Sequence, residues 1–511
     1  MSQGTGVVGT RSARPTGYVR PTWQEAVGEY LPPRWRGVRS RVWIGRLPMV
    51  AVVVVTVAMS ARLSNTAFID EAHTIAVGRD LLLQWFAGGP AVNSGPAPSG
   101  VPGLYPVGAA ALDAVGGLRL ARLFSLVCVV VAVVALGSAA ARATASNRIG
   151  LLTAYAFALT APVVFVGSLA TPDAACLALL AVAVRTGVAN RSSVSAAITG
   201  ALVALAAAVG YVAVLFAPAV LLTTLLVPPG EVPVRRRPAI ALAVAAGLLG
   251  GLYLAAGSQI RVGIATAAAS LVTPVAGQSS GTLGAEAALD MGLLLVLAVA
   301  GAVQAVRTGT VGRAAAACGL LIGGVAVPVV QLTTGGATSF NQHNAYAALL
   351  LAPLAGYALT VLSRQLFRAA PVVVILVLAL LPEFSRSDAL FHQWSDVTVV
   401  MSDIQAHPQP GVYLSVASDV FAYHSRDTVT GVRWEATSTL YAQGTAAVRA
   451  AVAERRHQVI VLRSVSTASP GQDVLLAALA LSADYEKDPL VQPTGPARDQ
   501  WLVYRLVNTL P

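Results

Sequence analysis

The sequence predicts a polytopic α-helical membrane protein with a small α/β domain at its C-terminal end, and three observations support this fold class. Of the 511 residues, 56% are hydrophobic and only 11% are charged, whereas soluble domains carry about 25% charged residues. The hydrophobic residues gather in runs long enough to cross a bilayer. Residues 384–511 instead combine short apolar runs with frequent charges of both signs. This composition excludes a cytosolic enzyme, a disordered chain and a coiled coil.

The first element is a basic tail, residues 1–42. The whole chain has 34 Lys and Arg against 23 Asp and Glu, a net charge of +11. Seven arginines lie in this tail and an eighth, Arg46, stands at the beginning of the first apolar run, and many others lie in short connections between later runs. Arginines placed in this way mark the cytoplasmic side of a membrane and do not indicate a nucleic-acid partner. We therefore expect the tail to be cytoplasmic.

The second element, residues 43–383, is expected to be a transmembrane domain. About eleven apolar runs are long enough to span the bilayer: 43–61, 121–141, 149–170, 174–189, 194–209, 211–227, 238–256, 288–306, 314–332, 345–363 and 369–383. Every second connection carries arginine, as cytoplasmic loops do: Arg142 and Arg148, Arg185 and Arg191, Arg235 to Arg237, Arg307 and Arg313, Arg364 and Arg368. This alternation predicts a multi-pass protein of the cell membrane in which residues 384–511 lie outside the cytoplasm.

Two outer connections, 62–119 and 258–290, are longer than simple connectors need to be. Within the first, residues 70–86 have apolar side chains on one side of a helix and polar side chains on the other. This pattern predicts a helix along the membrane surface.

The third element, residues 384–511, is expected to be an extracytoplasmic α/β domain. Gly411–Ser418, Gln458–Ser464 and Trp501–Val507 have the composition of strands, and a helical segment precedes the second of them. The stretch Asp419–Asp427 follows the first strand. The aromatic residues of this domain either form its core or stack on sugar faces. Because open α/β sheets bind ligands beyond the carboxyl ends of their strands, this stretch is the surface where a sugar would bind in the second case.

Carboxylates at the outer edge of the membrane are the candidate reactive groups. Asp70 and Glu71 stand a few residues beyond the first span, where partial desolvation raises a carboxyl pKa and suits it to general-base catalysis. The alternative is that they only begin a helix, where the helix dipole favours acids. Asp173 caps the fourth span or joins that pair in an acidic cluster. Such a cluster of Asp70, Glu71 and Asp173 would orient a hydroxyl or hold a divalent cation.

Four segments together resemble the GT-C superfamily of polyprenyl-phosphate-sugar glycosyltransferases, in the branch of protein O-mannosyltransferases and aminoarabinose transferase. They are NTAFIDEAHTIAVGRDLL with its acidic pair, YPVGAAALDAVGGLRLARLFSLV with its proline and arginine, TPDAACLALL, and FNQHNAYAALLLAPLAGYAL. The resemblance covers about residues 43–383. It implies a GT-C fold and the transfer of a pentose or a hexose such as mannose from polyprenyl phosphate to an extracytoplasmic glycan, lipid or protein.

The resemblance also implies roles for individual residues. Asp70 would deprotonate the acceptor hydroxyl and Glu71 would support it, in an inverting displacement with lipid phosphate as leaving group. The resemblance implies that Arg122 and Tyr346 bind the donor phosphate, with Arg119 as the alternative to Arg122. At His343–Tyr346 the chain lacks the basic residue that relatives often carry beside the tyrosine, so His343 or Arg261 would have to supply that charge.

Other functions are weighed on the same residues. No glycine-rich phosphate loop follows a strand and no DxD occurs in the C-terminal domain, which argues against a nucleotide-sugar donor. A transporter or flippase of lipid-linked glycans would carry charges at mid-membrane and internal repeats, neither of which is evident. A scaffold protein would not need so many spans. An O-antigen ligase-like transferase is the nearest enzymatic alternative and would depend on outer Arg and His residues.

Overall fold

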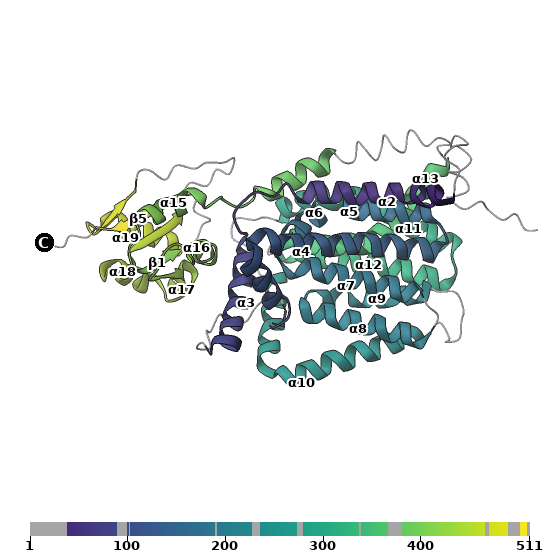
Figure 1. Ribbon diagram of the computed structural model, residues 1–511, viewed down its shortest axis with the longest axis horizontal. Helices are drawn as coiled ribbons and strands as arrows, with labels where there is room; N and C mark the ends of the chain where they lie inside the picture. The colour runs from purple at the N-terminus through teal and green to yellow at the C-terminus, as the bar shows by residue number, and fades with distance from the viewer. Residues whose placement is uncertain are drawn as a thin grey trace, which may run out of the picture. The chain divides into compact units, whose positions relative to one another are not determined.

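The computed structural model describes residues 38–88, 100–101, 103–189, 192–226, 236–272, 280–336, 339–365, 381–464, 470–488 and 501–507. Contacts divide the chain into a unit of residues 1–51 and a unit of residues 52–511. The helices from α3 onward and the C-terminal sheet belong to the second unit (Figure 1).

Helices make up the described part of the chain as far as residue 365. Their bounds are α2 (Val38–Ser60), α3 (Ile69–Ala87), α4 (Tyr105–Thr144), α5 (Asn147–Ala158), α6 (Ala161–Ser168), α7 (Pro172–Ala189), α8 (Ser193–Val209), α9 (Ala213–Leu222), η2 (Thr223–Leu226), α10 (Arg236–Val272), α11 (Ser280–Thr308), α12 (Val311–Thr334) and α13 (Phe340–Gln365). A further helix covers residues 381–391. The α-helical prediction for this region is confirmed.

Fewer helices than the expected eleven have the length and apolarity of a membrane span. Within the described residues there are six, in α4, α7, α10, α11, α12 and α13, or up to seven if the bent pair α5–α6 is one span. The runs expected at 43–61, 194–209 and 211–227 form shorter apolar helices. Most of the run at 369–383 lies outside the described residues.

Breaks in the helices shape the outer connections. α5 and α6 meet at 67°, where Pro162 occupies the first turn of α6 and cannot continue the preceding helix. α4 bends at Gly116 and Gly117, and Gly117 has a φ of 67°, which favours glycine. The connection expected at 62–119 therefore contains α3 and the first part of α4. The one expected at 258–290 consists, in its described residues, of the ends of α10 and α11.

The C-terminal region is a five-stranded sheet in the order β2-β1-β3-β5-β4. The strands are β1 (Gly411–Ser415), β2 (Val432–Ala436), β3 (Val459–Arg463), β4 (Tyr485–Lys487) and β5 (Trp501–Leu506). β1 pairs in parallel with β2 and β3, whereas β5 runs antiparallel to β3 and β4. The strands expected at residues 411, 458 and 501 are confirmed, while β2 and β4 had not been predicted.

Helices cover both faces of this sheet, which buries two separate apolar cores. α15 (Thr398–Ala406) and α16 (Ser418–Ser425) pack on one face with Tyr413 and Trp501. α17 (Thr437–Ala442), α18 (Thr445–Ala453) and α19 (Pro470–Leu481) lie in sequence after β2, and α18 and α19 pack on the other face with Leu414 and Ile460. The alternation of inward side chains along β1 and β3 supplies both cores at once.

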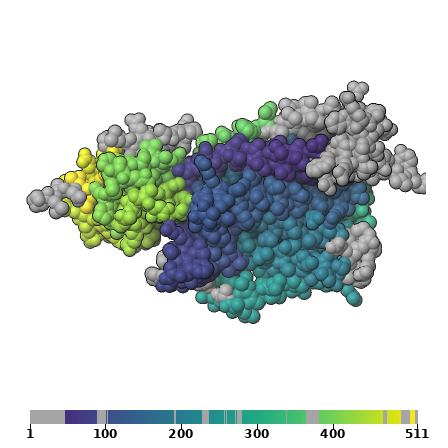
Figure 2. All heavy atoms as spheres, in the orientation of Figure 1, coloured from purple at the N-terminus to yellow at the C-terminus, as the bar shows by residue number. Residues whose placement is uncertain are grey.

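The α/β fold touches the helical bundle through α3 and α16. Ala67, just before α3, and Ala72, near its beginning, are buried in the same core as Phe421 of α16. Figure 2 shows the surfaces of the α/β residues, in green and yellow, meeting those of the bundle, in purple and blue. This contact brings residues from both ends of the sequence to one cavity.

Candidate functional site

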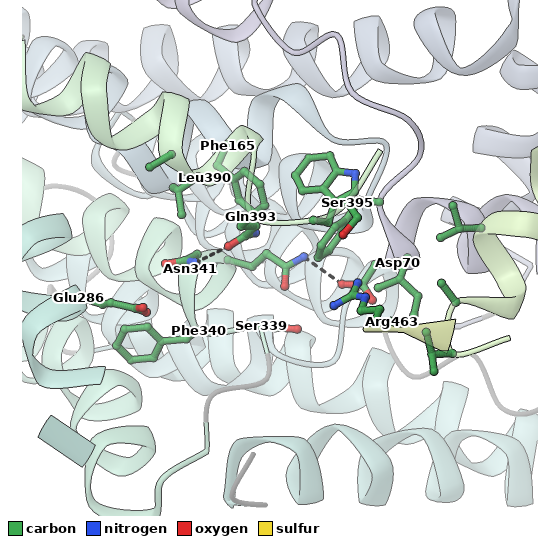
Figure 3. A pocket seen from close by; sticks show the side chains of 18 of the residues that line it. Asp70, Phe165, Glu286, Ser339, Phe340, Asn341, Leu390, Gln393, Ser395 and Arg463 are labelled. Atoms are coloured by element: carbon green, nitrogen blue, oxygen red, sulfur yellow. Dashed lines mark hydrogen bonds between the residues drawn. The ribbon is translucent and has the colours of Figure 1, made fainter. Parts of the chain in front are cut away.

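A cavity of about 550 Å³ lies where α3, α11, α13, the 381–391 helix and the α/β fold meet (Figure 3). Its lining includes the charged residues Asp70, Glu286, Arg386 and Arg463. Its apolar lining includes the aromatic residues Phe68, Phe165, Phe340, Trp394 and Trp501. A mostly apolar cavity with a few convergent polar groups has the character of a ligand site.

Asp70 is the carboxylate that α3 presents to this cavity. It lies in the first turn of α3, and its Oδ2 accepts a hydrogen bond of 3.1 Å from Nε2 of Gln342, at the beginning of α13 (Figure 3). Burial raises the pKa of Asp70 above its ordinary value, and the hydrogen bond from Gln342 opposes this shift. A carboxylate with a raised pKa is a stronger base and can take a proton from a hydroxyl.

Glu71, the next residue, turns away from the cavity and is fully buried. Its carboxylate accepts hydrogen bonds from the backbone N–H groups of Phe68 and Ala170, at 2.8 and 2.6 Å. It also accepts hydrogen bonds from Nε and Nη2 of Arg122, at 2.9 and 2.7 Å. Every strong acceptor direction of this carboxylate is thereby occupied, so its geometry is that of an anchor joining three segments of chain.

Arg122 is correspondingly held inside the protein. Besides Glu71, its guanidinium donates to the backbone carbonyls of Asn65 and Thr66, at 3.0 and 3.2 Å. These contacts use four of the five N–H groups that a guanidinium has. Arg122 does not occur among the described residues that line the cavity. In this structure its guanidinium positions the chain before α3 and is not presented to a phosphate.

Asp173 and Tyr346 form a hydrogen-bonded pair. The Tyr346 hydroxyl donates to Oδ1 of Asp173 at 3.0 Å, and the Tyr346 ring stacks on Phe216 at 5.0 Å. Asp173 is close enough to Asp70 for their charges to interact. Neither Asp173 nor Tyr346 occurs among the described residues that line the cavity.

The other residues expected to meet the donor phosphate lie elsewhere. His343 is buried, and its Nδ1 is 3.0 Å from Oε1 of Gln331. Arg261 is exposed on α10. Neither occurs among the described residues that line the cavity. The cationic side chains among the described lining residues are Arg386 and Arg463. Nε of Arg386 donates to Oδ1 of Asp290 at 2.5 Å, and Arg463 stands at the end of β3.

Sequence reasoning missed both of these arginines. Arg386 stands just beyond the last apolar run, where an outer-edge charge could have been noticed. Arg463 closes a strand whose position was predicted, but only the strand order shows that its end borders the cavity.

The three carboxylates expected to hold a divalent cation do not form such a site. Glu71 is fully engaged by Arg122 and two backbone N–H groups, and Asp173 is bonded to Tyr346. Across the described ranges, no group of three His, Cys, Asp or Glu side chains is arranged to bind a metal ion. We therefore derive no catalytic step through a metal.

The stretch Asp419–Asp427, where a sugar would bind if the domain has a sugar-binding surface, contacts α3 and α4 in this structure. Asp419 lies 3.0 Å from Nδ1 of His73 on α3. Tyr423 and Arg426 both donate to the carboxylate of Asp113 on α4, each at 2.5 Å. The hydrogen bond with Asp419 raises the pKa of His73, so the imidazolium form strengthens this contact.

Comparison with known proteins identifies the fold. No family model and no curated protein sequence matches the chain. Among solved structures, ArnT from Cupriavidus metallidurans in the apo state is 15% identical with a TM-score of 0.59, over 92% of this chain and 98% of that one. The same protein bound to undecaprenyl phosphate is 16% identical, with a TM-score of 0.58 over 91% and 98% of the two chains.

Two further structures share the architecture. The oligosaccharyltransferase AglB from Archaeoglobus fulgidus, in complex with an inhibitory peptide and a dolichol-phosphate, is 13% identical with a TM-score of 0.51, over 92% of this chain and 75% of that one. Arabinofuranosyltransferase AftD from Mycobacteria is 15% identical with a TM-score of 0.52, over 90% of this chain and 40% of that one. The resemblance to the GT-C fold is thereby confirmed.

Proposed function

We propose that this protein, which shares the fold of GT-C glycosyltransferases, transfers a sugar from a polyprenyl-phosphate donor to an acceptor hydroxyl outside the cytoplasm. The observation that carries the proposal is Asp70, a carboxylate of raised pKa at the wall of a cavity between helices and the α/β fold. The fold comparison supports the donor class, since ArnT was solved with undecaprenyl phosphate and AglB with a dolichol-phosphate. In this proposal the N-terminal tail is cytoplasmic and about eleven spans place residues 384–511 outside.

The proposed chemistry is a single inverting displacement. The acceptor hydroxyl gives its proton to Asp70 while its oxygen attacks the anomeric carbon, and the bond to the lipid phosphate oxygen breaks. Gln342 holds the Asp70 carboxylate in place through its 3.1 Å hydrogen bond. The leaving phosphate gains negative charge during this step, so a nearby fixed cation stabilises the transition state.

Arg386 is the cation that we assign to the leaving phosphate, in place of Arg122. Arg386 lines the cavity, and the 2.5 Å bond from its Nε to the buried Asp290 fixes its guanidinium. The other N–H groups of the guanidinium take no part in that bond. Arg386 also stands at the outer end of the helical region, next to the last apolar run, where a lipid headgroup would lie.

The proposal is tested by substituting Asp70→Asn, which keeps the shape of the side chain and removes its basicity. Protein in lipid nanodiscs would be given labelled polyprenyl-phosphate mannose or polyprenyl-phosphate arabinose with an extract of extracytoplasmic glycans and lipids. We expect the variant to lose about 10² to 10⁴ in rate. Asp388→Asn is the matched control, because Asp388 is exposed and does not occur among the described lining residues.

Two results would contradict the proposal. One is transfer by Asp70→Asn at the wild-type rate. The other is movement of an intact lipid-linked sugar across the membrane without cleavage, which would indicate the flippase alternative.

A further inference from the structure

The end of the cavity away from Asp70 holds a carboxylate that no described residue pairs with. Glu286 lies in the second turn of α11 and lines the cavity. Its carboxylate makes no hydrogen bond or ion pair with any residue that the structure describes. Asp290, four residues later on the same side of α11, is instead bonded to Arg386 at 2.5 Å. Glu286 is therefore the acid of this helix that remains available to a ligand.

Two amide side chains accompany this carboxylate in the lining of the cavity. Asn341 lies at the beginning of α13, and Gln393 follows the 381–391 helix. Figure 3 shows Glu286 and Asn341 at one end of the cavity and Asp70 at the other. Nδ2 of Asn341 donates to Oε1 of Gln393 at 3.4 Å, which is longer than the range of about 2.7–3.2 Å for ordinary N–H···O bonds. Because this bond is weak, a ligand can replace it with hydrogen bonds of its own.

The chemistry of these groups defines what they can bind. An ionised carboxylate only accepts hydrogen bonds, whereas an amide both accepts and donates them. Glu286 therefore needs a ligand that donates, and hydroxyl groups, which donate and accept, also suit the amides of Asn341 and Gln393. A ligand with a carboxylate of its own would be repelled by Glu286, since the nearby Arg386 is already paired with Asp290.

The position of Arg386 indicates which reactant meets Glu286. Arg386 is the cation assigned to the leaving phosphate, and Glu286 is close enough to it for their charges to interact. The donor sugar is bonded to that phosphate, so the two lie next to each other in the cavity. In an inverting displacement the acceptor oxygen attacks from the side opposite the leaving group, which in this cavity is the side of Asp70. Glu286 is therefore placed to meet the donor sugar and not the acceptor.

We propose that Glu286, together with Asn341 and Gln393, binds the hydroxyl groups of the donor sugar and selects sugars that carry no acidic group. This inference rests on the proposed function and deepens it, because it assigns the chemical class of the donor sugar. Phe340, which precedes Asn341 and lines the cavity, would pack against the C–H groups of the same sugar ring. A neutral hydroxylated sugar such as mannose or arabinose fits this arrangement, and a uronic acid does not.

Binding of intact donors to the full-length protein in nanodiscs without acceptor tests the subsite. The probes are bare polyprenyl phosphate and its mannose, arabinose and glucuronate conjugates, measured by their competition with a labelled polyprenyl phosphate. The bare lipid gives the contribution of the phosphate and the chain, so any additional affinity belongs to the sugar. We expect the mannose or the arabinose conjugate to bind at least about tenfold more tightly than the glucuronate conjugate, because hydrogen bonds to a charged group are strong and like charges repel.

Variants separate the subsite from general effects on the fold. Glu286→Gln keeps the size of the side chain and removes its charge. It should narrow the preference for neutral conjugates to less than about threefold by a gain in glucuronate binding, which a damaged fold would not produce. Asn341→Ala should weaken the neutral conjugates severalfold and leave the bare lipid unaffected. Glu486→Gln is the matched control, because Glu486 is exposed on β4 and does not occur among the described lining residues.

The outcomes for the subsite and for the proposed function are distinguishable. Equal binding of neutral and acidic conjugates by the wild-type protein, or an unchanged preference in Glu286→Gln, would overturn this inference. Asp70→Asn should bind the neutral conjugates as the wild-type protein does. If Asp70→Asn loses transfer while Glu286→Gln keeps the wild-type preference, the subsite is wrong and the proposed function stands. If Asp70→Asn transfers sugar at the wild-type rate while Glu286→Gln accepts the acidic donor, the subsite stands and the proposed base is wrong.

Discussion

Replacing Glu71 by Gln should destabilise the protein, whereas the same kind of change at Asp70 should leave its stability nearly intact. The two acids are neighbours in one helix turn, but Glu71 is fully buried and accepts four hydrogen bonds. Asp70 accepts one, from Gln342. The comparison therefore separates the anchoring role from the basic role within a single dipeptide.

The magnitude follows from the donors around Glu71. One carboxylate oxygen accepts hydrogen bonds from Nε of Arg122 and the backbone N–H of Ala170. The other accepts hydrogen bonds from Nη2 of Arg122 and the backbone N–H of Phe68. A Gln side chain replaces one oxygen by an NH₂ group. In either orientation of the amide, two of the four N–H donors would then face this NH₂ group, which cannot accept their hydrogen bonds. The guanidinium of Arg122, only 12% exposed, also loses its counter-charge. Breaking a buried pair in this way destabilises a protein by about 3–5 kcal/mol.

The assay is the thermal midpoint of the protein in nanodiscs, read from the soluble fraction after heating. A loss of this size lowers the midpoint by roughly 10 °C in a domain of a few hundred residues. Arg122→Met should have a similar effect, and the double variant should lose less than the sum, because the two side chains are coupled. A Glu71→Gln protein with a wild-type midpoint and no transfer would refute this reasoning and make Glu71 catalytic.

Three further predictions concern the proposed base and the contact of α3 with its neighbours. Transfer should decline on acidification at a pH above the ordinary Asp value of 3.8, because burial raises the pKa of Asp70 and only its ionised form accepts a proton; a pH–rate profile still flat at pH 4 would argue against this. The pKa of His73 is raised, so its bond to Asp419 stabilises the folded protein fully below the unfolded pKa of about 6.5, and this stabilisation is lost as the pH rises through the folded pKa. The thermal midpoint should therefore fall more between pH 6 and pH 9 in the wild-type protein than in Asp419→Asn. Equal falls in the two proteins would contradict this prediction. Gly78→Ala should separate α3 from α4, since its Cβ would lie 1.9 Å from the Pro106 carbonyl oxygen, whereas Gly108→Ala meets nothing within 4 Å; equal thermal midpoints and equal transfer rates for the two variants would show that this approach is not tight.

The sequence indicates where a carboxylate stands along the chain but not which way it faces. Asp70 and Glu71 are separated by about 100° around their helix, so one of them must turn away from any given neighbour. Which one does is decided by Arg122, fifty-one residues later in the chain, and by the backbone of Ala170. Neither partner is identifiable from the local sequence, and the family resemblance had placed Arg122 at the donor phosphate.

The secondary structure was predictable where the apolar pattern was uninterrupted. α12 and α13 coincide closely with the expected runs at 314–332 and 345–363. The run at 149–170 appeared continuous, but a proline in its middle divides it into α5 and α6. In the sheet, β1 and β3 were evident from their apolar residues. β2 carries Arg433 and Glu435 at an edge and β4 has three residues, so both lacked a strand signal.

The arginines of the cavity were not predictable for a different reason. Arg386 and Arg463 lie seventy-seven residues apart, in a helix and at a strand end. They share a cavity only because the α/β fold docks on α3. Such long-range contacts leave no periodicity in the sequence.

The contacts of α16 with the bundle limit how the two halves of this protein can be recombined. Asp419 reaches His73, and Tyr423 and Arg426 reach Asp113. A chimera that receives the α/β fold of a distant relative would place foreign side chains opposite His73 and Asp113, leaving the half-buried imidazole and the buried carboxylate without their partners. The functional module for engineering is therefore discontinuous: residues 62–119 and 384–507 would have to be transplanted together.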